Sequence, residues 1–229
     1  MELNGTSAAI HKIEIKGIMV FAIAIDGHAA SGKGTVAKGV AEFFGYSYLD
    51  TGLIYRALAR ISLSKDRATM SKKGLINIAR SFRPEYLNLK NLRSDEVGNY
   101  ASEIASYPEV RFELIKFQRN FVTQSNGAVL DGRDIGTIIL PDAQLKVFVT
   151  ADLNIRANRR YNELFQKDKS IIFEKVLADL SKRDQQDTDR EHAPLKISND
   201  AHLIDTSELS IEASIAYVVD QVNSIKGKI

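Results

Sequence analysis

The chain has 229 residues, of which 44% are hydrophobic and 26% charged, a composition that suits one well-filled domain and excludes disordered, collagen-like and coiled-coil proteins. Its net charge is +2, from 31 basic and 29 acidic residues, so it carries no wide basic surface for nucleic acid. The lack of cysteine excludes disulfides, thiolate zinc sites and a cysteine nucleophile, and the four histidines show no paired metal spacing.

Residues 1–17 precede the first apolar run, and we expect them to form an N-terminal extension. They lack the basic region that begins a signal peptide. No apolar run approaches the roughly 20 residues that span a bilayer. We therefore expect a soluble, cytoplasmic protein that binds neither membranes nor nucleic acid.

An apolar run over residues 18–25 predicts a buried strand, and a glycine-rich turn, GHAASGKGT, follows at residues 27–35. A helix is predicted over residues 33–44, because apolar residues recur on one face and Gly45 can end it. The apolar face of that helix is formed by Val36, Val40 and Phe43.

A short strand, YSYLD, is predicted after this helix, and Thr51 begins the next helix. Residues 65–93 are more polar and less periodic, with one alternating run, EYLNLKNL, and no enrichment in glycine, serine or proline. We interpret them as an insert rather than a linker. Ser94 can cap a further helix, and Pro108 can begin another, which Gly127 ends.

Three further strands, AVLD, LKVFVT and HLIDT, alternate with helices in the rest of the chain. The loop GRDIGTIILPDAQ separates the first two, and a strongly charged helical stretch covers residues 152–192. The final helix has apolar residues at Ile211, Ile215, Val218, Val222 and Ile225. Because the strands lack polar alternation, we expect an α/β fold with a parallel sheet covered by helices on both faces.

The glycine-rich turn has the plan of a phosphate-binding loop (P-loop), in which backbone N–H groups and the start of a helix form an anion nest. Gly27 and Gly32 allow backbone geometry that a Cβ would block, and Lys33 can reach the β and γ phosphates. The strict pattern places Ser or Thr directly after the lysine, whereas this chain has Gly34 and then Thr35. The loop predicts a bound nucleotide without distinguishing a kinase, a GTPase or a motor, and the absence of an NKxD motif weakens the GTPase.

The form GKGT is typical of nucleoside monophosphate (NMP) kinases. Further segments resemble the bacterial cytidylate kinase family, in family order over residues 20–215. These segments are YLDTGLIYRAL, ASEIASYPEVR, QRNFV, DGRDIGTIILPDA, RANRRY, KRDQQDTDR with APL, and DAHLIDTSELSI. The resemblance implies a P-loop NTPase-type fold, with a doubly wound five-stranded parallel sheet, an NMP-binding insert and a helical lid.

On this resemblance, residues 18–64, 94–151 and 196–229 form the core, 65–93 the insert and 152–195 the lid. The implied reaction moves the γ-phosphate of Mg-ATP to CMP or dCMP, giving CDP or dCDP, with ATP and Mg²⁺ as cofactors. We expect a monomer. The alternatives are a kinase for another acceptor such as UMP, and a catalytically inert nucleotide-binding switch.

On the donor side, the resemblance implies contacts to ATP from Gly27, His28, Ala29, Ala30, Ser31, Gly32, Lys33, Gly34, Thr35 and Arg156. The loop around residues 205–209 is expected to contact adenine. Asp131 ends the strand AVLD, where an acidic group can reach Mg²⁺ through water, with Thr35 as the nearest hydroxyl. Two polyanions repel each other unless fixed cations lie between them. The residues expected in catalytic roles are Lys33, Asp131, Arg133, Arg160 and Arg190.

On the acceptor side, the resemblance implies a site built from Thr51, Arg56, Ser102, Arg111, Arg133, Asp134, Arg183, Asp187 and Arg190. A carboxylate near N4 of the base accepts a hydrogen bond from cytosine and repels uracil. Asp134, with Ser102 and Arg111, matches the family's base-reading set. The family contacts the acceptor phosphate with residues that match Arg56, Arg133 and Arg190, and the ribose with residues that match Arg183 and Asp187.

Simpler structural roles remain open for several of these residues. Asp134 could cap a turn, and Ser102 could be a helix-surface residue. Arg183 and Asp187 could form an i,i+4 ion pair. Solvated positions are expected for Arg60, Arg67, Arg80 and Arg119.

The chain departs from the family at His28, where the family usually has proline, and at Ala30, where glycine is more common. Neither position supplies an essential side chain, so we expect the loop to keep its function. The segment 57–101 is shorter than the extended insert of the bacterial enzymes. We expect the small sheet of that insert to be reduced or missing.

Overall fold

The computed structural model describes residues 14–15, 18–64 and 71–228. Two parts of the predictions lie outside the described residues. They are most of the predicted extension and residues 65–70 of the insert, which include Arg67. Within the described part of the chain, no helix is both long and apolar enough to cross a membrane.

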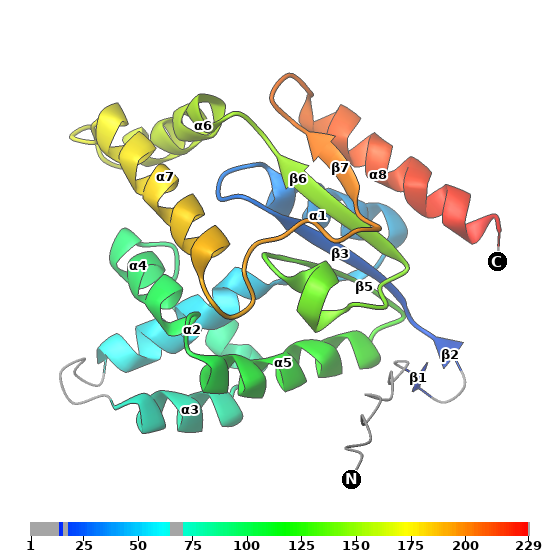
Figure 1. The fold of residues 1–229 in the computed structure, drawn as a ribbon, viewed down its shortest axis with the longest axis horizontal. Coiled ribbons are helices and arrows are strands. Elements are labelled where there is room, and N and C mark those ends of the chain that lie inside the picture. The colour runs from blue at the N-terminus through cyan, green and yellow to red at the C-terminus, as the bar shows by residue number, and fades with distance from the viewer. Residues whose placement is uncertain (1–13, 16–17, 65–70, 229) are drawn as a thin grey trace, which may run out of the picture.

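A five-stranded parallel sheet forms the centre of the molecule, as predicted (Figure 1). Its strand order is β4-β5-β3-β6-β7. The strands are β3 (Phe21–Gly27), β4 (Ser47–Asp50), β5 (Gly127–Gly132), β6 (Leu145–Thr150) and β7 (His202–Asp205). Because all neighbours are parallel, their carboxyl ends share one edge, where α/β sheets bind their ligands.

The strand predicted over residues 18–25 is divided between two sheets. Ile18–Met19 forms β2, which pairs antiparallel with β1 (Glu14–Ile15). The chain joins the main sheet only from Phe21, which pairs with Gly127 of β5. The apolar run is continuous in sequence, so composition alone did not reveal the division.

Helices cover both faces of the sheet, which makes the fold doubly wound (Figure 1). They are α1 (Lys33–Phe44) and α8 (Ile211–Lys226) on one face, and α2 (Thr51–Ser64), α4 (Asp95–Ile104) and α5 (Pro108–Thr123) on the other. Ile23 and Ile25 point into the first layer, whereas Ala24 and Leu130 point into the second. Both sets are fully buried, so burial of apolar area on both faces stabilises the sheet.

The predicted apolar face of α1 is wrong at Phe43, which is 64% exposed. The side chains that turn inward are those of Val36, Ala37, Val40 and Ala41. At about 100° per residue, this face is centred about 90° from Phe43 and close to Phe44, which packs against the core. Ile211, predicted to be apolar core, is also exposed because it begins α8 at the first turn.

The described part of the insert, residues 71–93, contains helical turns and no strand. They are α3 (Lys72–Arg80) and the 3₁₀ turn η1 (Pro84–Asn88). Leu75 and Ala79 of α3 pack into the same cluster as α2, α4 and α5, so these residues share the main core.

The predicted start of α4 is confirmed, because Ser94 Oγ accepts a hydrogen bond from Val97 N at 3.4 Å. The predicted end of α5 at Gly127 is wrong. The helix ends at Thr123, and Gly127 begins β5, where an added Cβ would lie 2.3 Å from the Tyr46 ring. Close packing against an aromatic ring, rather than a helix stop, explains this glycine.

The charged stretch after β6 forms two packed helices, α6 (Leu153–Phe165) and α7 (Phe173–Asp189) (Figure 1). Their small apolar cluster, with Ala157 at its centre, includes Ala29 of the P-loop. The predicted loop between β5 and β6 contains a single-turn π-helix, η2 (Ile135–Ile139). Single π turns are rare and frequent at functional sites.

Candidate active site

A cavity of about 780 Å³ opens at the carboxyl edge of the sheet. The predicted site residues that line it are Ala29, Ala30, Gly32, Lys33, Gly34, Thr35, Thr51, Arg56, Ser102, Arg111, Asp131, Arg133, Asp134, Arg160, Arg183, Asp187 and Arg190. Those that do not line it are Gly27, His28, Ser31 and Arg156. The volume lies within the range of small-molecule sites, about 300–1,000 Å³.

The P-loop glycines are required by geometry, as predicted. A Cβ at Gly27 would lie 2.0 Å from the carbonyl oxygen of Val149 on the neighbouring strand. Gly32, at φ 85°, is the N-cap of α1, and Ala30 also has a positive φ of 59°. Alternation between left- and right-handed conformations turns successive N–H groups toward one side, which is how an anion nest forms.

Arg156, expected to contact ATP, lies behind the loop rather than in the cavity. Its guanidinium donates to Ala29 O at 3.3 Å and to Ala151 O at 2.9 Å, and it pairs with Asp184 at 2.6 Å. The side chain is buried and its donors are engaged. In this structure Arg156 contacts the P-loop from α6.

Arg159 and Thr206 also fix the P-loop from outside. Thr206 Oγ1 donates to Ser31 O at 2.8 Å. Arg159 donates to Thr206 Oγ1 at 3.1 Å and to Thr206 O at 2.6 Å. The loop after β7 is thus in direct contact with the phosphate-binding loop.

Lys33 reaches over the loop, where its Nζ donates to His28 O at 3.3 Å. Burial lowers the pKa of Lys33 to about 8, and the charge of Arg133 adds to this effect, whereas Asp131 opposes it. An anion beside the lysine would stabilise its charged form.

Asp131 is the penultimate residue of β5, and its carboxylate lies beside Gly34 of the P-loop. Tyr48 Oη donates to Asp131 Oδ1 at 2.8 Å, and Thr51 Oγ1 donates to the main-chain oxygen of Asp131 at 2.8 Å. Burial raises the pKa of Asp131 to about 6, with Asp50 adding and Lys33 opposing. The hydroxyl in contact with this carboxylate is that of Tyr48, and Thr35, expected to lie near the metal ion, lines the same cavity.

These residues fit a magnesium ion that is shared with a nucleotide. Among the described residues, no group of three His, Asp or Glu side chains forms a metal cage. Mg²⁺ usually keeps several waters and binds one or two carboxylates together with substrate phosphates. A single buried carboxylate at the rim of a phosphate nest, as Asp131 provides, matches that requirement.

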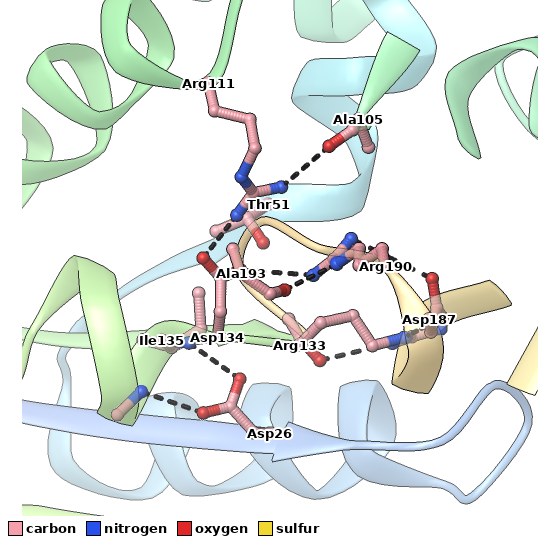
Figure 2. Close-up of polar contacts among 12 residues, drawn as sticks. Asp26, Thr51, Ala105, Arg111, Arg133, Asp134, Ile135, Asp187, Arg190 and Ala193 are labelled. Atoms are coloured by element: carbon pink, nitrogen blue, oxygen red, sulfur yellow. Dashed lines mark hydrogen bonds and ion pairs between the residues drawn. The ribbon is translucent and has the colours of Figure 1, made fainter. Parts of the chain in front are cut away.

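Asp134 lies between two guanidiniums (Figure 2). Arg111 Nη2 donates to Asp134 Oδ2, and Arg111 Nη1 donates to Ala105 O at 3.2 Å. Arg190 Nη2 lies 3.9 Å from Asp134 Oδ1. Asp134 occupies the N-cap position of η2, yet its side chain makes no cap hydrogen bond. The simpler role of a turn cap is therefore excluded for Asp134.

Arg133 and Asp187 form a close pair in the same cavity, next to Arg190 (Figure 2). Arg133 Nε donates to Asp187 Oδ2 at 2.6 Å. The alternative i,i+4 ion pair between Arg183 and Asp187 is not formed in the described structure, and Arg183 Nε is buried without a hydrogen-bond partner there. Burial lowers the pKa of Arg183 to about 10, and the charge of Arg133 adds to this effect. A buried donor with no partner beside a cavity is a candidate ligand-binding group.

Arg56 and Arg160 line the cavity while bound to other partners. Arg56 Nη1 donates to Leu92 O at 2.9 Å, and Arg160 pairs with Asp95 at 3.1 Å. Asp95 begins α4, so Arg160 links α6 to α4 across the cavity. Both arginines would have to exchange these contacts to reach a phosphate.

Ser102 lines the cavity from α4 and donates its hydroxyl hydrogen to Gly98 O, one turn back, at 3.2 Å. Its oxygen can still accept a hydrogen bond. This arrangement leaves both the base-reading role and the helix-surface role open for Ser102.

Several cavity residues were missed by the sequence analysis. They are Tyr48, Asp50, Tyr55 and Arg93. Arg93 pairs with Asp50 at 3.0 Å. The other three lie in YSYLDTGLIYRAL, where a strand ends and a helix begins, and that position was the available signal. Arg119, predicted to be solvated, instead donates to Ile139 O at 2.9 Å and to Ile138 O at 3.0 Å.

A family model described as cytidylate kinase matches residues 23–224. The cytidylate kinase of Rhodopseudomonas palustris (strain BisB18) is 44% identical over 204 residues, which cover 89% of this chain and 96% of that protein. The cytidylate kinase of Bartonella henselae is 46% identical over 205 residues, which cover 90% and 95%. Since both relatives are matched over nearly their whole length, the segment 57–101 is no large deletion relative to them.

Among solved structures, an uncharacterized protein from Eubacterium ventriosum ATCC 27560 has a similar fold, with a TM-score of 0.51 at 16% identity. The alignment covers 89% of this chain and 98% of that one. The family model spans most of the sequence, and the two relatives named above align with 89–90% of it. The chain belongs to the cytidylate kinase family.

Proposed function

We propose that the protein transfers the γ-phosphate of Mg-ATP to CMP or dCMP, giving ADP and CDP or dCDP. The observation that carries this proposal is the position of Asp134 between Arg111 and Arg190 in the same cavity as the P-loop. A carboxylate suited to reading cytosine and guanidiniums suited to phosphate thus face the donor loop across one space. Membership of the cytidylate kinase family supports the same activity.

On the donor side, the amides of the P-loop and Lys33 bind the ATP phosphates. Asp131 holds Mg²⁺ through water, with Tyr48 orienting its carboxylate. Mg²⁺ held there would supply positive charge that offsets the charge of the ATP phosphates. Arg160 leaves Asp95 and contacts the phosphates when the lid closes, which excludes water from the reacting centre.

The transfer step needs no general base. An oxygen of the acceptor phosphate, already anionic, attacks the γ-phosphorus, the bond from that phosphorus to the β–γ bridging oxygen breaks, and ADP leaves with the electron pair. The developing charge is stabilised by fixed guanidiniums, so catalysis is positioning plus electrostatics. Arg133 and Arg190 supply these charges from two sides of the acceptor, and Arg56 joins them after leaving Leu92 O.

Base selection rests on Asp134. Cytosine presents an N4 amino donor to which the carboxylate accepts a hydrogen bond, whereas uracil presents an oxygen that the carboxylate repels. Ser102 and Arg111 complete this part of the site. Arg183 and Asp187 bind the ribose, since Arg183 has a buried donor without a partner among the described residues.

The test is ADP release, measured in a coupled assay with CMP, dCMP, UMP and AMP offered one at a time. We expect turnover with CMP and dCMP, and a kcat/KM at least about tenfold lower with UMP and AMP. A Lys33→Met variant should lose turnover and still bind CMP in calorimetry. Equal use of UMP would favour the broader pyrimidine kinase, and no acceptor-dependent turnover would favour the inert switch.

We also propose that the protein acts as a monomer in the cytoplasm. The absence of cysteine fits a reducing compartment. Light scattering should give the mass of one chain, and a dimer mass would contradict this part of the proposal.

A further inference from the structure

The turn that carries Asp134 is capped by a residue from a different strand. In η2 the first N–H groups have no partner inside the turn, a need that the side chain at the N-cap usually meets. Asp is among the best N-cap residues. Asp134 stands at that position, but its carboxylate is turned toward Arg111 and makes no cap hydrogen bond.

Asp26, at the end of β3, supplies the missing cap (Figure 2). Its Oδ1 accepts from Ile135 N at 2.8 Å, and its Oδ2 accepts from Gly136 N at 2.8 Å. The carboxylate is 5% exposed, so water cannot replace these bonds easily. An N-cap side chain usually accepts from the second or third amide of a helical turn. The second amide of η2, Gly136 N, is thus already occupied by Asp26.

Arg119 closes the other end of the same turn. Arg119 lies on α5, and its guanidinium donates to the carbonyl oxygens of Ile138 and Ile139 in η2. An anion at the first amides and a cation at the last carbonyls both match the dipole of a helical turn. The segment next to the cavity is therefore fixed at both ends by charges outside it.

We propose that Asp26 is a positioning residue: by capping η2 in place of Asp134, it keeps the Asp134 carboxylate free to read the base of the acceptor. This rests on the proposed function, because it assumes that Asp134 contacts the base. Without Asp26, two buried amides would lack an acceptor, which carries a free-energy cost. The nearest carboxylate that can meet the cost is that of Asp134, at the N-cap itself.

The decisive variant is Asp26→Asn, which keeps the size of the side chain and removes one acceptor. We expect the CMP/UMP ratio of kcat/KM to fall about tenfold or more, because Asp134 turns toward the free amide. The KM for ATP should stay within about twofold of the wild-type value. General destabilisation would not lower the CMP/UMP ratio while leaving the KM for ATP unchanged. Thermal unfolding followed by circular dichroism measures any loss of stability separately.

Arg119→Met is the matched comparison, because it loosens the same turn without leaving an amide free. We expect a raised KM for CMP with the CMP/UMP ratio nearly unchanged. Arg80→Met is the control, since Arg80 also contacts α5, through an exposed pair with Glu113 at 3.0 Å, but does not touch η2. It should leave both quantities as in the wild type. A collapse of the ratio in Arg119→Met would show that loop rigidity alone sets discrimination and would overturn the proposal.

Epistasis separates this proposal from its alternatives. If Asp26 acts through Asp134, adding Asp26→Asn to an Asp134→Asn background should not change the CMP/UMP ratio further. A further fall of the ratio in the double variant would contradict the proposed route. The wild-type assay tests the proposed function independently: a wild type without preference for CMP refutes that function, whereas a preference that Asp26→Asn retains refutes only the role of Asp26.

Hydrogen exchange of the unsubstituted protein keeps the test valid if Asp26→Asn does not fold. We expect the amides of Ile135 and Gly136 to be protected to the same degree as the amides of β5, with and without CMP. Fast exchange of these two amides in the free protein would mean that the cap is not preformed, and the proposal would be wrong.

Discussion

The hydroxyl of Tyr48 donates to Asp131 at 2.8 Å and stands directly beside Gly34, where a strict P-loop has Ser or Thr. A Cβ added at Gly34 would lie 3.6 Å from Tyr48 Oη and 3.5 Å from Asp131 Oδ2. A hydroxyl from β4 therefore lies beside Gly34, in contact with the Asp131 carboxylate. Its donated hydrogen bond also lowers the pKa of Asp131, against the burial that raises it to about 6.

Replacing Tyr48 with Phe should therefore weaken metal binding. We expect the affinity for Mn²⁺ in the presence of ATP, measured by electron paramagnetic resonance, to fall about tenfold, a usual loss when a group that orients a metal ligand is removed. The loss should be larger at pH 6 than at pH 8, because Asp131 then takes up a proton more readily. Tyr46→Phe is the control, since Tyr46 stacks on Phe44 and does not line the cavity. Equal Mn²⁺ affinity in Tyr48→Phe and wild type would contradict this role.

The parts of the site that sequence analysis predicted are those carried by short motifs. Lys33, Arg133 and Asp134 stand in short motifs that can be recognised from neighbouring residues alone. All three line the same cavity. The sheet was predicted for a similar reason, since each strand is a local apolar run next to a turn.

The contacts that were missed join distant parts of the chain. Asp26 and Ile135 are 109 positions apart, and Tyr48 and Asp131 are 83 apart. Nothing local marks Asp26 as a cap, because it follows an apolar run as any strand-ending residue does. The misplaced face of α1 has a different cause: alanines are small enough to pack against the sheet, so the largest side chain, Phe43, was given too much weight.

Asp134→Asn should change which base the protein prefers. The amide can still accept from Arg111, so the buried guanidinium keeps a partner, but its NH₂ group now faces the base. We expect kcat/KM to fall for CMP and to rise for UMP, with a change in their ratio of about tenfold or more. The KM for ATP should not move. A CMP/UMP ratio equal to that of the wild type would show that Asp134 does not contact the base.

Arg190→Met should affect the acceptor far more than the donor. Arg190 lies on the acceptor side, 3.9 Å from both Asp134 and Asp187. We expect the KM for CMP to rise at least tenfold, since a charged hydrogen bond contributes about 1.5–3 kcal/mol, whereas ATP affinity in calorimetry stays within about twofold. A larger loss of affinity for ATP than for CMP would mean that Arg190 binds the donor nucleotide, which would contradict this prediction.

Gly27→Ala should destabilise the protein by about 3 kcal/mol or more, because the new methyl group would lie 2.0 Å from the rigid backbone oxygen of Val149. Gly45→Ala is the matched control. Its φ of 65° costs about 1–2 kcal/mol, but nothing lies within 4 Å of an added Cβ. Urea unfolding should therefore give a clearly larger loss at Gly27. Equal losses of unfolding free energy in the two variants would contradict this prediction. They would mean that β3 and β6 move apart enough to admit the methyl group.

The buried carboxylate of Asp26 should make stability depend on pH. Burial raises its pKa to about 7, against the hydrogen bonds from Gly136 and Ile135, whereas the unfolded value is about 3.9. Between these values the folded protein binds a proton that the unfolded chain has lost, so the free energy of unfolding falls as the pH rises from about 4 to about 7. Above pH 7 this group contributes no further change.

Asp26→Asn removes that dependence. We expect the unfolding free energy of the variant, relative to the wild type, to increase by roughly 2–3 kcal/mol between pH 5 and pH 8. Denaturant titrations at the two pH values measure this difference. A difference between Asp26→Asn and wild type that is the same at both pH values would mean that Asp26 stays ionised throughout, and that the two amides of η2 outweigh the cost of burying its charge.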